Sequence, residues 1–254
     1  MKFSTLQSIA RHPLAHRLGV CTICGRNTIF FRTDPSARNG FGCLYCRSSS
    51  RNRHVAKVVL EAFPGMHSAA SLTQKSGFRV YNADHTGALA RVLAGCAGCV
   101  SSAFLPGVAP GKEIAPGVTC QNLEQLTFPD KSFDCVITED VLEHVRDYRA
   151  ALGEIQRVLV PGGRHVFTIP FYFHMKTVVR VDTSGVEDVH LLPPEYHGDT
   201  IRGKILAFRT FGRDLFDELE EIGFETDVDF STYADRRSGI FDSVVFVSRK
   251  KGAK

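Results

Sequence analysis

The sequence predicts an α/β fold built on a mostly parallel sheet, with an antiparallel strand near the C-terminus and a small cysteine-rich segment at the N-terminus. Three observations predict this arrangement. From about residue 77 onward, short apolar runs alternate with amphipathic stretches, and the last two apolar runs follow each other with no helix between them. Two Cys-x-x-Cys pairs stand before residue 50. Strands that alternate with helices pair in parallel, whereas strands joined directly pair antiparallel.

The composition is that of an ordinary globular protein. The chain has 254 residues, of which 43% are hydrophobic and 23% charged, a length that suits one catalytic domain with a small appendage. No apolar run reaches the roughly 18 residues that span a membrane. The N-terminal stretch lacks the apolar core of a secretory signal, so we expect a cytoplasmic protein with no membrane partner.

The N-terminal part is expected to hold two helices around the cysteine pairs. Residues 1–20 are predicted to form a short helix and a turn. Residues 51–63 place Val55, Val58 and Val59 at helical spacing, and Pro64 with Gly65 then ends the helix. We therefore expect a helix and metal-binding segment over 1–65, and an α/β domain over 66–254.

Proline and glycine residues indicate where the elements of the α/β domain end. Pro161–Gly163 ends one helix, Gly223 ends another, and a Pro/Gly-rich stretch over 105–117 is a loop. Between a strand and the following helix, residues 171–208 form an insertion. Strands are predicted at 78–83, 99–104, 133–138, 164–170, 224–230 and 241–249, and helices at 88–95, 148–160 and from 213 to 222.

The four N-terminal cysteines have the spacing of a metal site. Cys21 and Cys24 form one pair, and Cys43 and Cys46 form a second pair 18 residues later. Each pair can chelate, and zinc prefers four soft ligands in a tetrahedron. Because all four ligands are cysteines, no coordination position stays open, so we expect a structural zinc ion and not a catalytic one.

Residues 120–170 carry a known family's motifs in order. They contain Phe-Pro-Asp at 128–130, Ser-Phe-Asp at 132–134, Val-Leu-Glu-His-Val at 141–145, Glu-Ile-Gln-Arg-Val-Leu at 154–159 and Pro-Gly-Gly at 161–163. This stretch closely resembles the methyltransferase type 11 family. The similarity extends more weakly from about residue 21 to 224, where the chain looks like a subgroup with an N-terminal zinc knuckle. The resemblance implies a Rossmann-like class I methyltransferase sheet that binds S-adenosylmethionine.

In an open α/β sheet, ligands bind beyond the carboxyl ends of the strands. The resemblance implies that Asn122 and Leu123 lie beside the adenine, and that Thr138 and Glu139 face the methionine and the methyl group. It assigns the other cofactor-binding positions to two strand ends, with these residues: Asn82, Ala83, Asp84, Gly87, Ser102 and Ala103.

Two of these positions depart from the family pattern. Asn82 stands where the family has an acid, and Ala103 stands where the family has the acid that grips the ribose hydroxyls. Losing a bidentate contact of that kind costs on the order of 1.5–3 kcal/mol. Asp84 is a candidate replacement.

The insertion over 171–208 is expected to overhang the cofactor, and it is rich in histidine and tyrosine. Histidine titrates near neutral pH, which suits a general base. Our first candidate is His197 and our second is His190, with Glu139 and His144 as alternatives nearer the expected methyl group. Glu143 and His144 are predicted to open the helix that follows, and a capping role for this pair is the alternative. For each histidine, a place in a structured lid is the competing interpretation.

The leading hypothesis is methyl transfer to a small polar acceptor, by O- or N-methylation of a sugar, a natural product or a similar metabolite. The second is an RNA methyltransferase that grips RNA through the knuckle and a basic helix carrying Arg47, Arg51, Arg53 and Lys57. The third, suggested by Asn82 and Ala103, is a protein that uses the same fold for binding or for chemistry other than methylation. The sequence predicts no oligomeric state.

Overall fold

The computed structural model describes residues 17–32, 34–61, 63, 65–74, 77–199, 203–230 and 234–252. The chain divides into two compact units. The first comprises Met1–Phe78, Thr86–Cys99 and Val228–Val245, and the second comprises Arg79–His85, Val100–Asp227 and Phe246–Lys254. Each unit therefore contains segments that lie far apart in the sequence.

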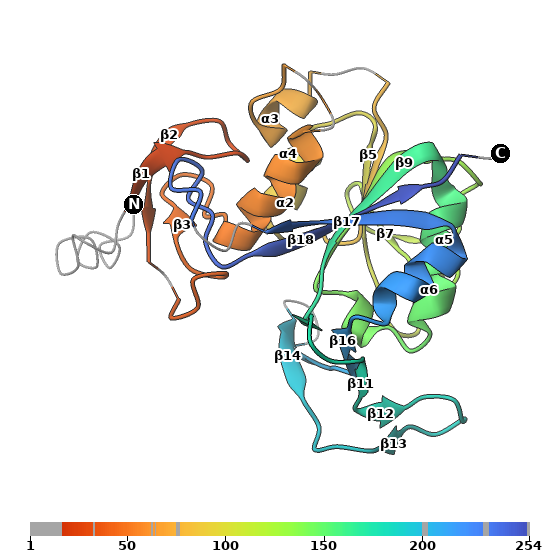
Figure 1. Cartoon of the computed structure of the whole chain (residues 1–254). Helices are drawn as coiled ribbons and strands as arrows, with labels where there is room; N and C mark the ends of the chain where they lie inside the picture. Colours follow the sequence, from red (N-terminus) through yellow and green to blue (C-terminus); the bar gives the residue numbers. More distant parts are fainter. Residues whose placement is uncertain are drawn as a thin grey trace. The chain divides into compact units, whose positions relative to one another are not determined.

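Where it is described, the first unit combines a small sheet with the helices α2, α3 and α4 (Figure 1). The antiparallel strands β1, β2 and β3 form the sheet in that order. The helices expected at 51–63 and 88–95 are both present, and Pro64 lies outside the described residues. The elements are β1 (Arg17–Val20), β2 (Asn27–Phe31), β3 (Gly42–Cys43), α2 (Ser50–Glu61), α3 (Ala69–Leu72) and α4 (Ala88–Leu93).

The described end of the first predicted helix is a strand. Residues 1–16 of that prediction lie outside the described residues, but residues 17–20 form β1, so the prediction of a helix and a turn is wrong there. Gly19 explains the difference. A Cβ atom at this position would lie 2.1 Å from the carbonyl oxygen of Arg237, and the amide of Val20 donates to the same oxygen at 2.7 Å. The chain is extended here because it lies directly against another backbone segment.

The second unit is built on an eight-stranded sheet in the order β17-β18-β9-β8-β4-β5-β7-β6. Strand β8 pairs in parallel with β4 and with β9, and β5 pairs in parallel with β7. Strand β18 pairs antiparallel with β9, as expected for the C-terminal end. The predicted fold class is confirmed. The strands are β4 (Val80–Asn82), β5 (Cys99–Ala103), β6 (Glu113–Ala115), β7 (Val118–Cys120), β8 (Phe133–Glu139), β9 (Leu159–Thr168), β17 (Phe224–Phe230) and β18 (Val244–Lys250).

Two local predictions about this sheet were wrong. The stretch over 105–117 is not all loop, because it contains β6, which pairs antiparallel with β7 at the sheet edge. Pro161–Gly163 does not separate a helix from a strand but lies inside β9. The register between β8 and β9 shifts at this point. Gly162 has a φ of +75°, so the glycines let the strand bulge and continue.

The helices of the second unit, α5 (Tyr148–Val158) and α6 (Leu215–Ile222), pack side by side (Figure 1). Asp147 caps α5 by accepting a hydrogen bond from the amide of Ala150 at 2.9 Å. Gly223 ends α6 with a φ of +103°, as the sequence predicts. Beneath these helices the central strands are apolar on both faces, and Val136, Ile137 and Phe167 are fully buried.

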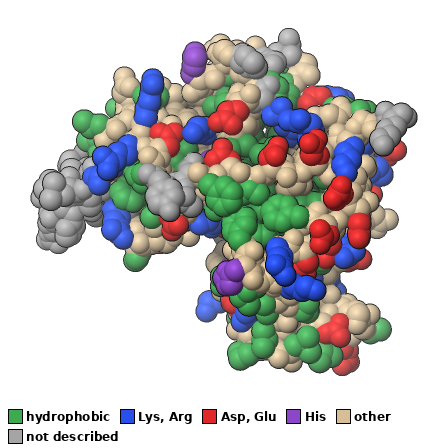
Figure 2. Space-filling view, in the orientation of Figure 1, with side chains coloured by type: hydrophobic (Ala, Val, Ile, Leu, Met, Phe, Trp, Pro, Cys, Tyr) green, Lys and Arg blue, Asp and Glu red, His purple; other side chains and the backbone are tan. Residues whose placement is uncertain are grey.

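The insertion over 171–208 folds as short paired strands. Figure 2 shows hydrophobic side chains over the part of the molecule where Figure 1 draws β12–β14. Exposed apolar side chains of this segment include Tyr172, Met175, Val179, Val189, Leu191 and Tyr196. Its strands, with the one that follows, are β10 (Phe171–Tyr172), β11 (Val178–Val179), β12 (Val181–Asp182), β13 (Val189–His190), β14 (Tyr196–Asp199), β15 (Gly203–Leu206) and β16 (Arg209–Gly212).

Candidate functional site

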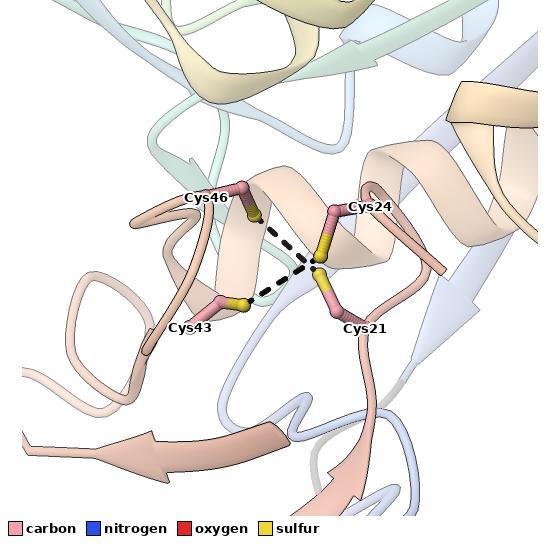
Figure 3. A group of neighbouring side chains, drawn as sticks. All are labelled: Cys21, Cys24, Cys43 and Cys46. Atoms are coloured by element: carbon pink, nitrogen blue, oxygen red, sulfur yellow. Dashed lines mark hydrogen bonds between the residues drawn. The ribbon is translucent and has the colours of Figure 1, made fainter. Parts of the chain in front are cut away.

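The four cysteines predicted to bind metal converge at one point in the first unit (Figure 3). The Sγ atoms of Cys21 and Cys46 lie 3.6 Å apart, and those of Cys24 and Cys43 lie 3.8 Å apart. Zinc–sulfur bonds of about 2.3 Å place the sulfurs of a tetrahedral site about 3.8 Å from one another. All four thiols are free of disulfides. The donor set and its spacing therefore fit a tetrahedral metal ion.

Two equivalent turns bring these sulfurs together. The amide of Gly25 donates to the carbonyl of Cys21 at 2.8 Å, and the amide of Arg47 donates to the carbonyl of Cys43 at 3.0 Å. Gly25 has a φ of +73° and Arg47 a φ of +63°. Each Cys-x-x-Cys pair is thus followed by a residue in the left-handed region, whose amide closes a tight turn on the first cysteine.

Arg53 supports the cysteine cluster from α2. Its side chain is fully buried and donates to the backbone carbonyls of Ser48, Phe41, Ser238 and Gly239. The hydroxyl of Ser48 lies 3.5 Å from the Cys21 sulfur and 3.2 Å from the Cys46 sulfur. Burial lowers the pKa of Arg53 to about 10, and negative charge on the cysteines opposes this shift. The guanidinium is therefore the positive charge that balances a cluster of thiolates.

Three of the expected site residues are the last residues of parallel strands in the second unit. Asn82 ends β4, Ala103 ends β5 and Glu139 ends β8. In chain order the parallel strands run outward from β4 through β5 to β7, and then return to β8 on its other side. The topological switch point therefore lies between Asn82 and Glu139, where sheets of this kind bind their ligands.

Asn82 has an unused acceptor at this switch point. Its side chain is 1% exposed, and its Nδ2 donates to the backbone carbonyl of Asp84 at 2.7 Å. Its Oδ1 is buried and has no hydrogen-bond partner among the described residues. A buried acceptor left unpaired costs about 1–3 kcal/mol. The site is therefore suited to a ligand that donates a hydrogen bond here.

Two of the expected cofactor positions have their side chains committed to the core. The Ser102 hydroxyl bonds the Tyr81 hydroxyl at 2.8 Å, and the Thr138 hydroxyl bonds Nε2 of His165 at 2.9 Å. Both residues are almost fully buried. Backbone groups at these positions are what remains to face a ligand.

The other expected cofactor positions lie on loops. Asn122 follows β7, and its Oδ1 accepts from the amide of Glu124 at 3.1 Å. Leu123 is buried beside it. Ala83 and Asp84 follow β4 directly, whereas Gly87 precedes α4 in the first unit. The cofactor-binding roles of these residues stay predictions.

Glu143 and His144 do not open α5 as expected. They lie in a separate 3₁₀ turn, η2 (Leu142–His144), and α5 begins four residues later at Tyr148. The Asp147 cap fixes that start. Arg209 donates to the carbonyls of Leu142, Val145 and Arg146, so the turn is held by β16.

This turn brings His144 against His197, the first candidate from the insertion. Nε2 of His144 lies 3.1 Å from Nδ1 of His197. Oε1 of Glu143 lies 3.7 Å from the first of these nitrogens and 3.5 Å from the second. The pKa of His197 is raised, mainly by the Glu143 carboxylate and in addition by Glu195, although burial alone would lower it. We call Glu143, His144 and His197 the His/Glu cluster.

The outer nitrogen of each histidine has its own acceptor. Nδ1 of His144 donates to the carbonyl of Leu206 at 2.7 Å. Nε2 of His197 lies 3.2 Å from a carboxylate oxygen of Glu195, whose other oxygen pairs with Arg180 at 3.0 Å. Both rings are therefore oriented by groups outside the cluster.

The structure brings together two of the four candidate catalytic residues. The group of described residues that converges contains His144 and His197 but not His190, which is exposed on β13 opposite Val181. Glu139 is half-buried at the end of β8. The sequence pointed to Glu143 only as part of a pair with His144, and Glu195 had no signal beyond its place near His197.

The basic residues of the RNA hypothesis are largely engaged within the first unit. Arg53 is buried against the cysteine cluster, the Arg47 guanidinium lies 5.2 Å from the Phe31 ring, and Lys57 pairs with Asp235 at 3.3 Å. Of these residues, Arg53 is therefore not available to contact RNA, and the RNA hypothesis stays a prediction.

A family model described as a methyltransferase domain matches residues 65–167. The centre of this chain is therefore similar in sequence to a methyltransferase domain. The match covers β4 through most of β9, which includes the switch point and the 3₁₀ turn. It also includes residues 120–167 of the stretch whose motifs resemble this family. Among the described residues, no helix is long and apolar enough to cross a membrane.

Similar proteins match over shorter stretches. The chain is 58% identical over 43 residues to the ubiquinone/menaquinone biosynthesis C-methyltransferase UbiE of Hahella chejuensis, covering 17% of each chain. It is 40% identical over 67 residues to a demethylmenaquinone methyltransferase of Corynebacterium glutamicum, covering 26% of this chain and 29% of the relative. The matched part thus spans between about a sixth and a third of these relatives.

Solved structures are similar at low identity. The S-adenosylmethionine-bound amino pentose methyltransferase CalS10 of Micromonospora echinaspora is 14% identical, with a TM-score of 0.47 over 80% of this chain and 92% of the other. A methyltransferase of Mesorhizobium loti is 17% identical, with a TM-score of 0.44 over 68% and 91%.

Proposed function

We propose that this protein is an S-adenosylmethionine-dependent methyltransferase that acts on a small polar acceptor, a hydroxyl or amine of a sugar, a natural product or a similar metabolite. The observation that carries the proposal is the unpaired, buried Oδ1 of Asn82. It lies at the switch point of a sheet whose sequence matches a methyltransferase domain. The names of the curated relatives, which concern quinone biosynthesis, support a small-molecule acceptor.

Residues at the strand ends would hold the cofactor. S-adenosylmethionine, when bound, supplies a methyl group carried on a positively charged sulfur. We propose that Oδ1 of Asn82 accepts a hydrogen bond from the cofactor, and that Asn122 and Leu123 flank its adenine. Ala103 offers no carboxylate for the ribose, so we assign that contact to Asp84, which directly follows the same strand end as Asn82.

The acceptor side is assigned to the His/Glu cluster. A direct displacement needs the acceptor and the methyl group held in line with water excluded. The exposed apolar side chains of the insertion, such as Tyr172 and Tyr196, can exclude water when an acceptor binds. His197 is our first choice among the cluster residues for a role on the acceptor side, and we propose no role for the exposed His190.

The cysteine cluster is assigned to a structural zinc ion. Its sulfur spacings fit tetrahedral zinc, and its four thiol donors leave no open position for chemistry. Buried Arg53 supplies charge for a zinc–thiolate centre, which carries two net negative charges.

Isothermal titration calorimetry with S-adenosylmethionine tests the proposal. We expect binding to the full chain, and weaker binding by about 5- to 150-fold for Asn82→Leu, because the change removes one hydrogen bond worth about 1–3 kcal/mol. Asn27→Leu, at an exposed asparagine on β2, should bind as the unmodified protein does. No binding at millimolar cofactor, or an unchanged affinity for Asn82→Leu, would contradict the proposal.

The RNA alternative has a separate readout. A protein that grips RNA through basic side chains should lose affinity steeply as salt concentration rises. Since Arg47, Arg53 and Lys57 have partners within the first unit, we expect little retention on RNA even at low salt. Salt-sensitive retention would favour RNA as the acceptor.

A further inference from the structure

The His/Glu cluster presents three electron-pair donors to one another. The Leu206 carbonyl can only accept, so Nδ1 of His144 carries a proton and its Nε2 turns a lone pair inward. The Glu195 carboxylate likewise keeps the proton of a neutral His197 on Nε2, which leaves a lone pair on Nδ1. These two inward nitrogens lie 3.1 Å apart. Lone pairs at that distance repel unless a positive charge lies among them.

A shared proton would satisfy only part of the cluster. It could join the two nitrogens, but the Glu143 carboxylate would still lack a hydrogen bond. Both carboxylate oxygens of Glu143 are buried with no hydrogen-bond partner among the described residues, and the side chain is fully buried. Their nearest recorded polar neighbours are the imidazole nitrogens at 3.5 and 3.7 Å. Buried carboxylates are paired with a charge or coordinate a metal, and a metal ion among these three groups would contact all of them.

The three separations match the edges of a coordination polyhedron. Nitrogen and oxygen ligands lie about 2.0–2.2 Å from zinc and similar ions, so neighbouring ligands of a tetrahedral site are about 3.3–3.6 Å apart. In an octahedral site the separation is about 2.8–3.1 Å, by the same bond lengths. The observed separation of 3.1 Å fits an octahedral edge and that of 3.5 Å fits a tetrahedral edge. The third separation, 3.7 Å, is just longer than a tetrahedral edge.

We propose that Glu143, His144 and His197 bind a divalent transition-metal ion at a second metal site, separate from the cysteine cluster. Two imidazoles with one carboxylate favour ions such as Mn²⁺, Fe²⁺, Co²⁺ or Zn²⁺ over Mg²⁺ and Ca²⁺, which prefer oxygen ligands. Leu206 and Glu195 orient the two histidines, and Arg180 holds Glu195. Such outer contacts are usual around metal-binding histidines.

Three protein ligands leave coordination positions open, unlike the four cysteines. An open position can bind an oxygen atom of a small molecule, and on the proposed function that oxygen belongs to the methyl acceptor. This last step rests on the proposed function, whereas the binding of the ion does not.

Manganese binding by the zinc-loaded full chain tests the site, because Mn²⁺ does not displace zinc from four thiolates. Free Mn²⁺ is counted by its electron paramagnetic resonance signal. We expect one bound Mn²⁺ per chain, and a loss of affinity of at least tenfold for Glu143→Gln and for His197→Gln. His174→Gln, at an exposed histidine of the same insertion, should bind as the unmodified protein does. Circular dichroism checks that each variant is folded. If Glu143→Gln or His197→Gln is unfolded, His144→Gln is measured in its place.

The outcomes separate this proposal from the proposed function. No Mn²⁺ binding at millimolar concentration, together with no visible absorption from added Co²⁺, would overturn the site. Binding that survives all three cluster substitutions would overturn its location. Mn²⁺ binding lost in the cluster variants supports the site even if the chain does not bind S-adenosylmethionine, which would overturn only the methyltransferase proposal.

Discussion

At the residue scale, Arg53 shows how one side chain can organise a unit. Its guanidinium donates to four backbone carbonyls from three separate segments, and it lies 4.2 Å from the ring of Phe30. A buried guanidinium normally requires a carboxylate. Here the nearby anionic groups are the cysteines, so the arginine and the metal cluster depend on each other.

We predict that Arg53→Met lowers the free energy of unfolding by about 3–5 kcal/mol, because it removes the buried charge and leaves carbonyls without donors. Urea denaturation at fixed zinc concentration measures the change. Arg26→Met, at an exposed arginine 5.0 Å from the Tyr45 ring, should change stability by no more than about 1 kcal/mol. Equal effects of the two substitutions would show that Arg53 has no special role.

His165 gives the protein a pH-dependent stability. It is fully buried in β9, and burial lowers its pKa to about 3. Below about pH 6.5 the unfolded chain therefore binds a proton that the folded chain does not bind. Stability is fully present above this pH and decreases toward pH 3, by up to about 1.4 kcal/mol per pH unit.

We predict that His165→Gln removes this dependence, because glutamine does not titrate in this range but can still bond the Thr138 hydroxyl. Between about pH 7.5 and pH 5, the unfolding free energy of the variant should gain about 2 kcal/mol relative to the unmodified protein. Denaturant unfolding at the two pH values measures this difference. Parallel pH profiles for the two proteins would contradict it.

Individual site residues were predictable only where their own spacing carried a signal. The cysteines were predicted by two short repeats, and the structure places all four sulfurs within 4.8 Å of one another. Glu195 and the role of Glu143 were not predictable, because each acts through His197. The contact between Glu143 and His197 joins residues about fifty positions apart, and only the fold of the insertion creates it.

At the element scale, the kinds of elements were predicted well and their boundaries less well. Proline and glycine were interpreted as a break at 161–163, whereas β9 continues through them. Local sequence favours a turn there, but β9 pairs with β8 at Leu159 and again from Arg164, so these residues form an irregularity within one strand. The 3₁₀ turn of Glu143 was missed for a related reason, since Arg209 holds it from a distant strand.

The different backbone conformations of Gly162 in β9 and Gly153 in α5 predict opposite effects for substituting them by alanine. Gly162→Ala should lower stability by about 1–2 kcal/mol, because alanine is strained at a φ of +75°. Gly153→Ala should raise stability by about 0.5–1 kcal/mol, because Gly153 lies inside α5 with open space around its Cα. Urea midpoints of both variants check the prediction, and a stabilising Gly162→Ala would show that β9 needs no bulge.

At the scale of the whole molecule, the sequence predicted the class of fold and, in the α/β domain, the order β4, α4, β5, β8, α5, β9, α6, β17 and β18. It did not predict which distant segments join each unit. Residues 228–245 belong with the N-terminal segment, where Ser50 bonds the backbone of Phe241 and His54 pairs with Asp229. Contacts of this kind depend on matching surfaces between segments, and no periodic pattern in either segment records them.

This division predicts that removing metal acts locally. The three strands of the first unit are short, and the cysteine cluster joins the ends of two of them. Because metal-binding energy contributes directly to folding in such small units, a zinc chelator should speed amide hydrogen exchange in β1–β3. The long strands β8 and β9, which have fully buried apolar side chains, should stay protected.

Hydrogen exchange measured by mass spectrometry resolves these segments. Protection of β1–β3 should return when zinc is added back, and Mn²⁺ should not restore it, because thiolates favour zinc. Cys99→Ser should respond as the unmodified protein does, since Cys99 lies outside the cluster. If elemental analysis confirms zinc loss while β1–β3 stay protected, the cysteine cluster does not stabilise the first unit. If β8 and β9 lose protection together with β1–β3, the two units unfold as one.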